Sequence, residues 1–414
     1  MNDLRRIIVV GAGECGMRAA LTLRDQGFDG EIDLINGEAV DPYERPPLSK
    51  YHPDGNSLKP IMGVDRLSSL GITRYDAVQC VGIDRHNKSI ELSSGKRLSY
   101  DRLLLAIGSR PRALVVDGKP VPKALLLRTS LDAERLHEQL LAHRHLVVIG
   151  GGFIGLEVAA LARQKNVSVT LVEVAPRLLG RAVPSELAER IEARHRQEGV
   201  TFHIGHKIKS ISKEGRVTLE NGTEICGDVL LAGIGSEPHV EVAKDAGLSV
   251  ENGILVDDKF QTSDPSIYAA GDCCAFPHPL YGMKRMRLES WRAAQEQGEH
   301  AARAILGSQL SYEAVPWFWS DQYYLTLQIA GLPSEGATVI SRLIDEDAEI
   351  LFHCDAEGRL VAASGICRGN RIARDIRLAE MLIAKRVCPD PALLRDPTIN
   401  LKTLLSSASA SASA

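Results

Sequence analysis

Two stretches of the chain share the same order of apolar runs and helical patterns. Residues 7–35 and 146–172 each begin with an apolar run, pass through a glycine-rich turn into a helix-like period, and end in a second apolar run. This order predicts a strand, a crossover helix and a parallel second strand, which form a βαβ unit. The predicted strands are 7–10, 31–35, 146–149 and 167–172, and the predicted helices are 17–26 and 156–165.

Shorter patterns fill the rest of the chain. Antiparallel hairpins are predicted over 89–100 and 216–225. Other predicted strands are 103–107, 229–232, 254–256, 267–270, 324–329 and 337–341. A helical pattern over 372–386 follows the last of these strands, so the C-terminal part is expected to combine a sheet with helices.

The turn of each βαβ unit carries the three spaced glycines of a dinucleotide-binding fingerprint. The glycines are Gly11, Gly13 and Gly16 in the first turn and Gly150, Gly152 and Gly155 in the second. In such a turn the first glycine makes the bend, the second lets the backbone approach a pyrophosphate, and the third lets the helix pack on the strand. Such turns also serve as plain connections, but two of them in full βαβ context indicate two dinucleotide sites. A chain with two such sites is expected to pass electrons from a diffusible dinucleotide to a bound one, as a flavoprotein reductase does.

The acid that closes the second unit bears on the choice between NADH and NADPH. Glu173 lies about 20 residues beyond the glycines, where a carboxylate binds the ribose 2′-hydroxyl and repels a 2′-phosphate. Arg177 and Arg181 follow it and could favour phosphate, so NADH is expected and NADPH is the less favoured alternative. In the first unit the equivalent position is Asn36, and Glu38 is either the ribose ligand or an exposed loop acid.

Composition narrows the class of protein further. The 414 residues carry a formal net charge of -4, which gives no basic field for nucleic acid, and no apolar run is long enough to span a bilayer. A cytoplasmic protein is therefore expected. The eight cysteines show no metal-ligand spacing, so no metal site is expected. Cys15, in the first fingerprint, is expected to pack against a cofactor, with redox chemistry as the alternative.

Three further motifs resemble the FAD-dependent ferredoxin reductases of oxygenase systems, the family of putidaredoxin reductase and biphenyl-dioxygenase ferredoxin reductase. They are Pro-Tyr-Glu-Arg-Pro-Pro-Leu-Ser-Lys over 42–50, Thr-Ser-Asp-Pro over 262–265 leading to Gly-Asp-Cys over 271–273, and Pro-Trp-Phe-Trp-Ser-Asp-Gln-Tyr over 316–323. The resemblance implies an α/β, glutathione-reductase-like fold with two Rossmann-like domains, the NAD-binding one inserted in the FAD-binding one, and a C-terminal α+β domain. The expected bounds are 1–112 with 248–320 for the FAD-binding domain, 113–247 for the NAD-binding domain, 321–404 for the C-terminal domain and 405–414 for a disordered tail.

The resemblance also implies which residues bind FAD. Arg45 and Lys50 would supply positive charge beside the flavin and its pyrophosphate, although both could belong to a solvated loop. Asp272 would bind the ribityl chain, and Trp291 would contact FAD or belong to the core. The full expected FAD set is Gly11, Gly13, Cys15, Gly16, Glu38, Arg45, Lys50, Cys80, Arg128, Gly271, Asp272 and Trp291.

For the nicotinamide dinucleotide, the resemblance implies that Glu157 orients the carboxamide and that Phe153 shields the flavin face. A helix-surface or core role is the alternative for both residues. The expected NAD set is Gly150, Gly152, Phe153, Ile154, Gly155, Glu157, Glu173, Gly233 and Gly235. Lys50 and Glu157 are the residues expected to take part in catalysis, while the cofactors carry the hydride chemistry.

The expected partner is a 2Fe–2S ferredoxin. No pair of cysteines follows the first fingerprint, so electrons are not expected to leave the flavin through a redox disulfide. Docking is expected near a basic run and neighbouring tryptophans, with a solvated charged face as the alternative; these residues are Lys284, Arg285, Arg287, Arg292, Trp317 and Trp319. A monomer or weak dimer is expected. The rival functions are a rubredoxin reductase, an NADH oxidase or peroxidase, and a redox sensor resembling apoptosis-inducing factor.

Overall fold

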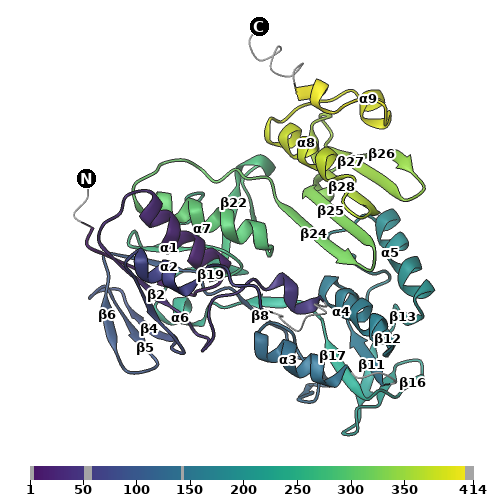
Figure 1. The fold of residues 1–414 in the computed structure, drawn as a ribbon, viewed down its shortest axis with the longest axis horizontal. Coiled ribbons are helices and arrows are strands. Elements are labelled where there is room, and N and C mark those ends of the chain that lie inside the picture. Colours follow the sequence, from purple (N-terminus) through teal and green to yellow (C-terminus); the bar gives the residue numbers. More distant parts are fainter. Residues whose placement is uncertain (1–3, 51–57, 141–143, 406–414) are drawn as a thin grey trace. The chain divides into compact units, whose positions relative to one another are not determined.

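The computed structural model describes residues 4–50, 58–140 and 144–405. It divides into two compact units, each built from separate stretches of the chain (Figure 1). Unit 1 comprises Met1–Pro47, Asn56–Arg110 and Glu237–Ala314, and unit 2 comprises Leu48–Gly55, Pro111–Ser236 and Val315–Ala414. The domain bounds drawn from the sequence stay predictions, and the expected tail over 406–414 lies outside the described residues.

Unit 1 is centred on a parallel sheet with the strand order β21-β7-β1-β2-β3. Its strands are β1 (Arg6–Val10), β2 (Glu31–Ile35), β3 (Ile72–Tyr75), β7 (Arg102–Leu105) and β21 (Ile267–Ala269). The apolar run of β1 explains its central place, since Ile7, Ile8 and Val9 have no solvent exposure. The predicted βαβ unit is confirmed, with its helix beginning a few residues earlier than expected, at Glu14.

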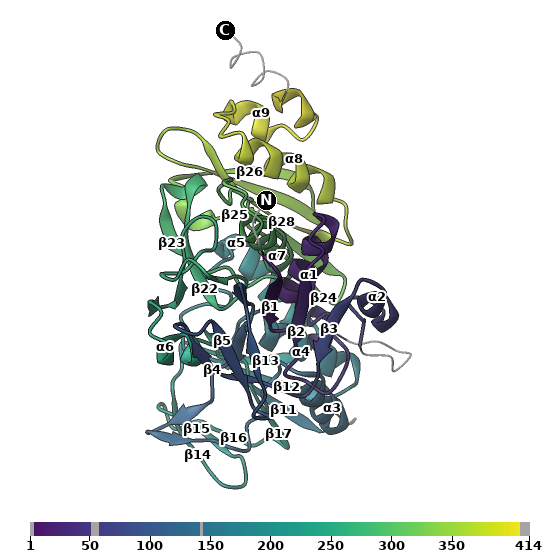
Figure 2. The same ribbon diagram turned by 90° about the vertical axis from the view of Figure 1, so that its left-hand side faces the viewer.

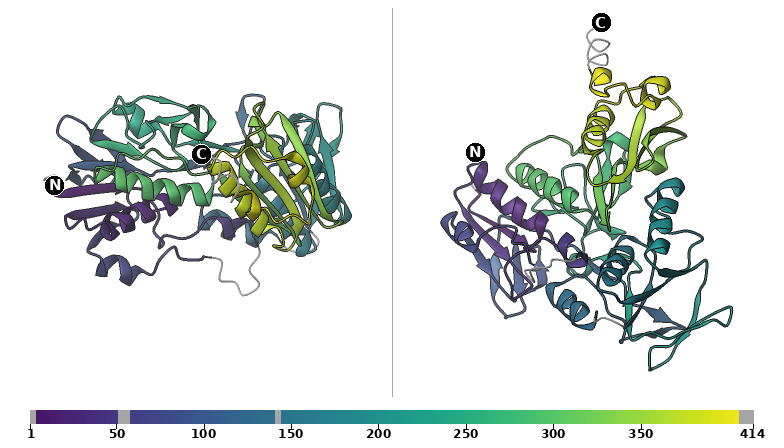
Figure 3. Two further views of the ribbon diagram at one scale, coloured as in Figure 1. Left: turned by 90° about the horizontal axis from the view of Figure 1, so that it is seen from above. Right: turned by 45° about the vertical axis from the view of Figure 1, so that its right-hand side comes forward.

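Two helices of unit 1 run side by side, α1 (Glu14–Asp25) and α7 (Trp291–Ile305) (Figures 1 and 3). Their close approach depends on Gly298, where an added Cβ would lie 2.3 Å from the carbonyl oxygen of Cys15. The remaining helices of the unit are α2 (Val64–Ser69) and α6 (Glu241–Asp245). Small sheets complete it, with strands β4 (Cys80–Asp84), β5 (Ser89–Leu92), β6 (Arg97–Ser99), β19 (Val250–Glu251), β20 (Gly253–Leu255), β22 (Cys274–His278) and β23 (Lys284–Met286).

Unit 2 contains a second parallel sheet, with the order β13-β12-β11-β17. Its strands are β11 (His145–Ile149), β12 (Ser168–Glu173), β13 (Val200–Ile204) and β17 (Val229–Ala232), and its helices are α3 (Ser130–Gln139), α4 (Phe153–Gln164) and α5 (Ser185–Gln197). The second predicted βαβ unit is therefore confirmed. The strands β14 (Ile208–Ile211), β15 (Val217–Leu219) and β16 (Glu224–Ile225) form a small antiparallel sheet beside it (Figure 2).

Unit 2 also holds an antiparallel sheet with the order β24-β25-β28-β27-β26, on which α8 packs against β25 and β28. The elements are β24 (Trp317–Gln322), β25 (Leu325–Gly331), β26 (Thr338–Asp345), β27 (Ala348–Cys354), β28 (Leu360–Arg368), α8 (Ala373–Ala384) and α9 (Pro391–Arg395). The expected α+β character of this part is confirmed. Short elements elsewhere are β8 (Ser109–Pro111), β9 (Val115–Val116), β10 (Lys119–Pro120), β18 (Ser236–Pro238), η1 (Pro46–Ser49), η2 (Pro279–Tyr281) and η3 (Pro333–Glu335).

Candidate functional site

The first glycine of each fingerprint makes a turn that no other residue could make without strain. Gly11 has φ +106° and Gly150 has φ +105°, in the region that disfavours side chains. An added Cβ would lie 2.2 Å from the carbonyl oxygen of Ala106 at Gly11 and 2.4 Å from that of Gly233 at Gly150. Each turn therefore packs backbone against backbone at the end of its parallel sheet.

The second glycine of each fingerprint faces open space. Gly13 is the N-cap of α1 and Gly152 is the N-cap of α4, and neither helix start has a side-chain cap. An added Cβ at Gly13 would meet no atom within 4 Å, and at Gly152 only the Gly233 carbonyl oxygen at 3.9 Å. The N–H groups of both helix starts thus point at space that a pyrophosphate can fill, with the helix dipole favouring its charge.

The third glycines fix the two helices to their turns. An added Cβ at Gly16 would lie 1.8 Å from the carbonyl oxygen of Gly11, and at Gly155 it would lie 2.2 Å from that of Gly150. The two fingerprints therefore have the same local geometry in both units, and this geometry fits the pyrophosphate that FAD and NADH share.

Glu173 is held against the fingerprint of unit 2. Its carboxylate accepts hydrogen bonds from the backbone N–H of Gly151 at 2.6 Å and of Ala175 at 2.7 Å. The Arg177 guanidinium donates to the carbonyl oxygens of Val183 at 2.9 Å and Gly180 at 3.1 Å. Arg177 is therefore committed to the loop that follows β12, whereas Arg181 lies beside Gly235, where an added Cβ would lie 3.8 Å from its Nη1.

Glu38 in unit 1 has a different set of partners. Its carboxylate accepts hydrogen bonds at 2.7 Å from the Tyr43 hydroxyl and at 2.7 Å from the Arg45 guanidinium. Its backbone N–H donates to Asn36 at 3.2 Å. The structure thus brings together two predicted FAD ligands, Glu38 and Arg45, as an ion pair.

The predicted residues of the Gly-Asp motif also meet within unit 1. Gly271 has φ +81°, and an added Cβ would lie 3.1 Å from the Cβ of Cys15. The Asp272 carboxylate accepts a hydrogen bond from the Ser109 hydroxyl at 3.0 Å. Burial raises the pKa of the Cys15 thiol well above its usual value, so Cys15 is a packing group in a neutral form.

Helix α7 brings the predicted ligand Trp291 to this region, together with Gln295 and Gln297, which the sequence did not single out. Gln295 donates to Glu14 at 2.6 Å, and the indole N–H of Trp291 donates to Glu14 at 3.1 Å. Gln297 has no solvent exposure and accepts from the Gly271 N–H at 2.8 Å, while its Nε2 has no partner among the described residues. An unsatisfied buried donor beside Gly271 fits a site that holds a polar group such as the flavin's ribityl chain.

The two residues expected to take part in catalysis lie together in unit 2. The Lys50 ammonium is 3.3 Å from Oε1 of Glu157, whose side chain is 6% exposed. The Ser320 hydroxyl donates to the same oxygen at 2.6 Å, and the Ser49 hydroxyl donates to Oε2. Glu157 is therefore a buried carboxylate with an ion-pair partner and two hydroxyl donors.

Aromatic side chains lie on α4 and β24, the two elements that carry Glu157 and Ser320. The Phe153 and Phe318 rings meet edge to face with centroids 5.2 Å apart. Trp317 and Trp319 are stacked with centroids 5.4 Å apart, and the Lys50 ammonium lies 5.7 Å from the Trp319 ring. Unit 2 thus offers an apolar, aromatic setting for a planar ring beside one buried ion pair.

The remaining predicted ligands lie at separate places in the structure. Cys80 lies on β4, and burial raises the pKa of its thiol to about 11. The Arg128 backbone N–H donates to Asp132 in the first turn of α3. Ile154 is 43% exposed on α4, and Gly235 has φ +96° after β17. Their ligand roles stay predictions.

The basic run expected to dock a partner is largely engaged in contacts within unit 1. Arg285 donates to the carbonyl oxygens of Ala275 at 2.7 Å and Val256 at 3.0 Å. The Arg287 side chain is 9% exposed and pairs with Glu289. These contacts give both arginines a structural role, and their docking role stays a prediction.

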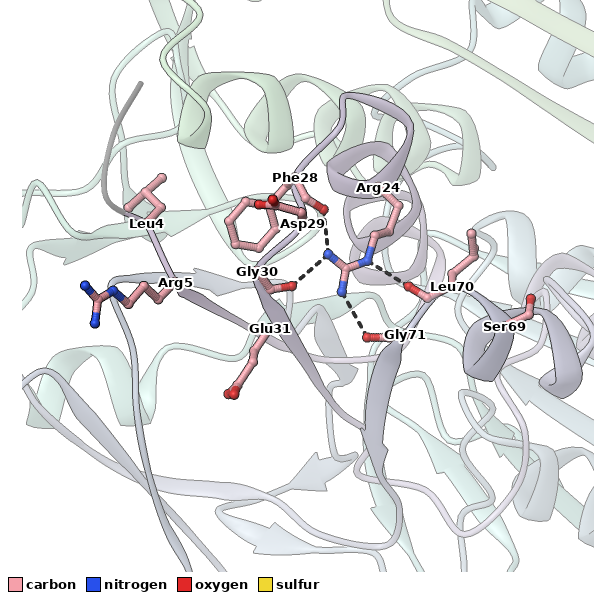
Figure 4. Close-up of a pocket in the computed structure, with 10 residues that line it drawn as sticks. All are labelled: Leu4, Arg5, Arg24, Phe28, Asp29, Gly30, Glu31, Ser69, Leu70 and Gly71. Carbon is pink, nitrogen blue, oxygen red and sulfur yellow. Dashed lines mark hydrogen bonds between the residues drawn. The ribbon is translucent and has the colours of Figure 1, made fainter.

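A hollow in the surface of unit 1 is lined by none of these residues. It is lined by Leu4, Arg5, Arg24, Phe28, Asp29, Gly30, Glu31, Ser69, Leu70 and Gly71 (Figure 4). The Arg24 guanidinium points into the lining and donates to the carbonyl oxygens of Phe28, Gly30, Leu70 and Gly71 (Figure 4). The Arg24 guanidinium thus joins the loop that holds Phe28 and Gly30 to the loop that holds Leu70 and Gly71. None of the lining residues is a predicted site residue.

No helix over 4–50, 58–140 or 144–405 is long and apolar enough to cross a membrane. Within the same ranges, no group of three or more His, Cys, Asp or Glu side chains could hold a metal ion.

Comparison with known proteins decides the family. The model of the pyridine nucleotide-disulphide oxidoreductases matches residues 5–298, and that of the reductase C-terminal domain matches residues 317–405. The chain belongs to the pyridine nucleotide-disulphide oxidoreductase family. This membership confirms the predicted fold class and the predicted enzyme class, an oxidoreductase that uses FAD and NADH.

Full-length relatives confirm the narrower resemblance as well. The chain is 37% identical to the ferredoxin–NAD(+) reductase component of the anthranilate 1,2-dioxygenase system of Burkholderia cepacia, over 96% of this chain and 98% of that one. It is 36% identical to a rubredoxin–NAD(+) reductase of Pseudomonas putida, over 87% of this chain and 95% of that one. The crystal structure of a covalent putidaredoxin reductase–putidaredoxin complex superposes with a TM-score of 0.91 at 36% identity, over 99% of this chain and 100% of that one.

Proposed function

We propose that this protein is an NADH-dependent ferredoxin reductase that delivers single electrons to a 2Fe–2S ferredoxin of an oxygenase or cytochrome monooxygenase system. The observation that carries the proposal is the pair of matched fingerprints, in which Gly13 and Gly152 leave open space at two uncapped helix starts. Two pyrophosphate cradles in one chain support two dinucleotides. Bound FAD supplies the chemistry that turns one hydride into two single electrons.

In this proposal, unit 1 binds FAD and unit 2 binds NADH. In unit 1, Gly11, Gly13 and Gly16 would hold the FAD pyrophosphate, while Asp272 and the unpaired Gln297 Nε2 would bind its polar chain. FAD would stay bound there, whereas NADH would bind only in passing. In unit 2, the second fingerprint would hold NADH and Glu157 would orient its carboxamide.

NADH is preferred over NADPH because of the charge beside the second fingerprint. Glu173 accepts two backbone N–H groups there, so its carboxylate is fixed where a ribose 2′-hydroxyl would donate to it. A 2′-phosphate would meet that negative charge, and Arg177 is committed to backbone carbonyl groups.

The partner is proposed from the relatives, which act with ferredoxins or rubredoxins according to their names. Because one relative of similar identity is a rubredoxin reductase, a rubredoxin is the second candidate acceptor. Docking near Lys284 and Trp319 stays part of the proposal. A cytoplasmic location is also proposed, since all eight cysteines are free thiols, as expected in a reducing compartment.

A panel of acceptors tests this function. NADH-driven electron transfer to 2Fe–2S ferredoxins and to rubredoxins would be followed with cytochrome c as the final acceptor. We expect at least one ferredoxin to raise the rate well above the control without a carrier. Stimulation by rubredoxins alone would replace the first acceptor with the second, and no stimulation by any carrier would refute the proposal.

A further inference from the structure

Strand β24 meets helix α4 in a register that puts polar groups together. Alternate residues of the strand share a face, and Ser320 and Gln322 are 2% and 3% exposed there. Phe153 and Glu157 lie four residues apart, so they share a face of α4. Two contacts join these faces of β24 and α4. The Phe318 ring meets the Phe153 ring, and one step farther along, the Ser320 hydroxyl donates to Glu157 at 2.6 Å.

The hydrogen bonds continue from Ser320 away from Glu157. Gln322 Nε2 donates to the Ser320 hydroxyl oxygen at 3.1 Å, and Gln322 Oε1 lies 2.8 Å from Nε2 of His195 on α5. The Tyr323 hydroxyl lies 3.2 Å from His195 Nδ1. All of these residues belong to unit 2. They form a continuous chain from the β24–β25 turn to the carboxylate.

The donor and acceptor of every hydrogen bond in this chain can be assigned by starting from the Glu157 carboxylate. A carboxylate only accepts, so the Ser320 hydroxyl must donate to Glu157 and must accept from the Gln322 amide. The amide oxygen of Gln322 then faces His195 Nε2, which must carry the proton. His195 Nδ1 is left as the acceptor for the Tyr323 hydroxyl. Each donor in the chain therefore points toward Glu157, the arrangement in which successive hydrogen bonds strengthen one another.

His195 can hold this single arrangement because it is neutral. It has no solvent exposure, and burial lowers the pKa of its imidazole to about 4. The Arg194 guanidinium lowers the same pKa further. At neutral pH the ring carries one proton, at Nε2, and one lone pair, at Nδ1.

Tyr323 ends the chain in a strained backbone conformation. It lies in the tight turn between β24 and β25, where Gln322 pairs with Leu325, and its φ is +57°. A bulky residue in this left-handed region costs about 1–2 kcal/mol relative to glycine, which is the usual choice in such turns. The tyrosine ring contacts His195 edge to face, with centroids 5.0 Å apart. The strain is offset by contacts that only this side chain makes.

We propose that Ser320, Gln322, His195 and Tyr323 are positioning residues that fix the Glu157 carboxylate for contact with the nicotinamide carboxamide. Oε1 of Glu157 is engaged by Ser320 and Lys50, and Oε2 receives the Ser49 hydroxyl. A carboxylate has about four acceptor positions, so one on Oε2 remains for an amide N–H of the ligand. The inference rests on the proposed function to the extent that Glu157 meets nicotinamide.

Two ligands separate positioning of the carboxamide from general damage to the domain. NAD+ carries nicotinamide, whereas ADP-ribose lacks it and reaches only the fingerprint and Glu173. In the FAD-loaded protein, Ser320→Ala removes the hydroxyl that donates to Glu157, and Ser320→Thr keeps it. We expect Ser320→Ala to weaken NAD+ binding and slow flavin reduction by NADH about 10-fold, with ADP-ribose affinity unchanged. Ser320→Thr is expected to stay within about twofold of the original protein.

Two more variants probe the far end of the chain. Gln322→Met keeps the volume but removes both the donor and the acceptor, so it should act like Ser320→Ala. Tyr323→Phe removes only the last hydroxyl and should slow flavin reduction about twofold to threefold. If Gln322→Met does not fold, Tyr323→Phe carries the test alone. Equal loss of NAD+ and ADP-ribose affinity, or no loss in any variant, would overturn the inference.

The readout does not depend on the acceptor protein. Flavin reduction by NADH is measured before any ferredoxin is added, so failure with ferredoxins would refute the proposed function and leave this inference standing. Conversely, an effect of these variants on ferredoxin reduction alone, with normal flavin reduction, would refute the positioning role.

Discussion

The two fingerprints begin alike and then diverge within a few residues. Gly11 and Gly150 have φ angles that differ by a degree, and the glycine contacts of the two turns match closely. In unit 1 the next position is Glu14, which binds Trp291 and Gln295 of α7. In unit 2 it is Phe153, which meets Phe318 of β24. The same glycine turn is thus followed by polar contacts in unit 1 and by aromatic contacts in unit 2.

The divergence continues one turn farther along each helix. Glu157 of α4 is a buried carboxylate, whereas the position with the same spacing in α1 is Arg18, which pairs with Glu299 at 3.8 Å on the surface. The closing acids differ in the same way, since Glu173 binds the backbone of its own fingerprint and Glu38 binds Arg45. The two turns thus share the glycines that shape a pyrophosphate cradle and differ in the side chains that follow them.

The largest expected effect comes from the third glycines. Gly16→Ala and Gly155→Ala each force a Cβ against a backbone carbonyl, at 1.8 Å and 2.2 Å. Backbone atoms cannot give way as side chains do, so we expect each variant to lose about 3 kcal/mol or more of unfolding free energy. Urea unfolding followed by circular dichroism measures this loss. A variant as stable as the parent would show that the turns are looser than described.

The second glycines separate cofactor binding from stability. Gly13 has φ -72° and Gly152 has φ -83°, which any residue can adopt, and a methyl group at either would enter open space. We expect Gly13→Ala to lower FAD content and Gly152→Ala to weaken NADH binding by about 100-fold with FAD retained, because the methyl group displaces the pyrophosphate.

Flavin absorbance and NADH titration measure these two effects. Each variant serves as the control for the other, and both should unfold within about 1 kcal/mol of the parent when all three proteins are compared without FAD. If Gly152→Ala lost FAD while Gly13→Ala lost NADH affinity, the two roles would have to be exchanged.

Acid should weaken both units through buried histidines, and unit 2 more than unit 1. Burial lowers the pKa of His195 and His353 in unit 2 and of His278 in unit 1 from 6.5 to about 4. Between these values the unfolded chain binds protons that the native chain does not, so stability is lost as pH falls from 6.5 toward 4. Each histidine should cost about 2 kcal/mol at about pH 5. Chemical unfolding at neutral and acid pH checks this, and equal stability at both would contradict it.

The smallest of these effects concerns the closing acid of unit 2. Glu173→Ala removes the carboxylate that accepts from Gly151 and would accept from the ribose. We expect the ratio of kcat/KM for NADH to that for NADPH to fall about 10-fold. Glu38→Ala in unit 1 is the matched control and should leave that ratio unchanged. A shift of the ratio by Glu38→Ala alone would place the NADH preference in unit 1 and contradict the role of Glu173.

The sequence was sufficient where local pattern decides the structure. Both βαβ units, the glycine turns and the acid at Glu173 follow from period and spacing, because a parallel strand and its crossover helix have strong local signals. The position of Glu157 beside Lys50 could be expected only from the family resemblance. Strands β27 and β28 were not anticipated, because their buried apolar runs lack a clear alternation.

Other parts of the site could not be anticipated because their partners lie far apart along the chain. Glu14 meets Trp291 across 277 positions, and Glu157 meets Ser320 across 163. Nothing local in the sequence marks Gln297 as the residue that binds the Gly271 N–H. The contacts of Arg285 and Arg287 could not be anticipated either. The sequence shows only a basic run, whereas in the structure Arg285 donates to a backbone carbonyl and Arg287 pairs with Glu289.

The most direct test of the account is an anaerobic titration of the FAD-loaded protein with NADH, followed by addition of an oxidised 2Fe–2S ferredoxin. We expect NADH to bleach the flavin and each NADH then to reduce two ferredoxins, because the flavin divides one hydride into single electrons. A flavin that NADH does not bleach, or a bleached flavin that no ferredoxin reoxidises, would contradict it.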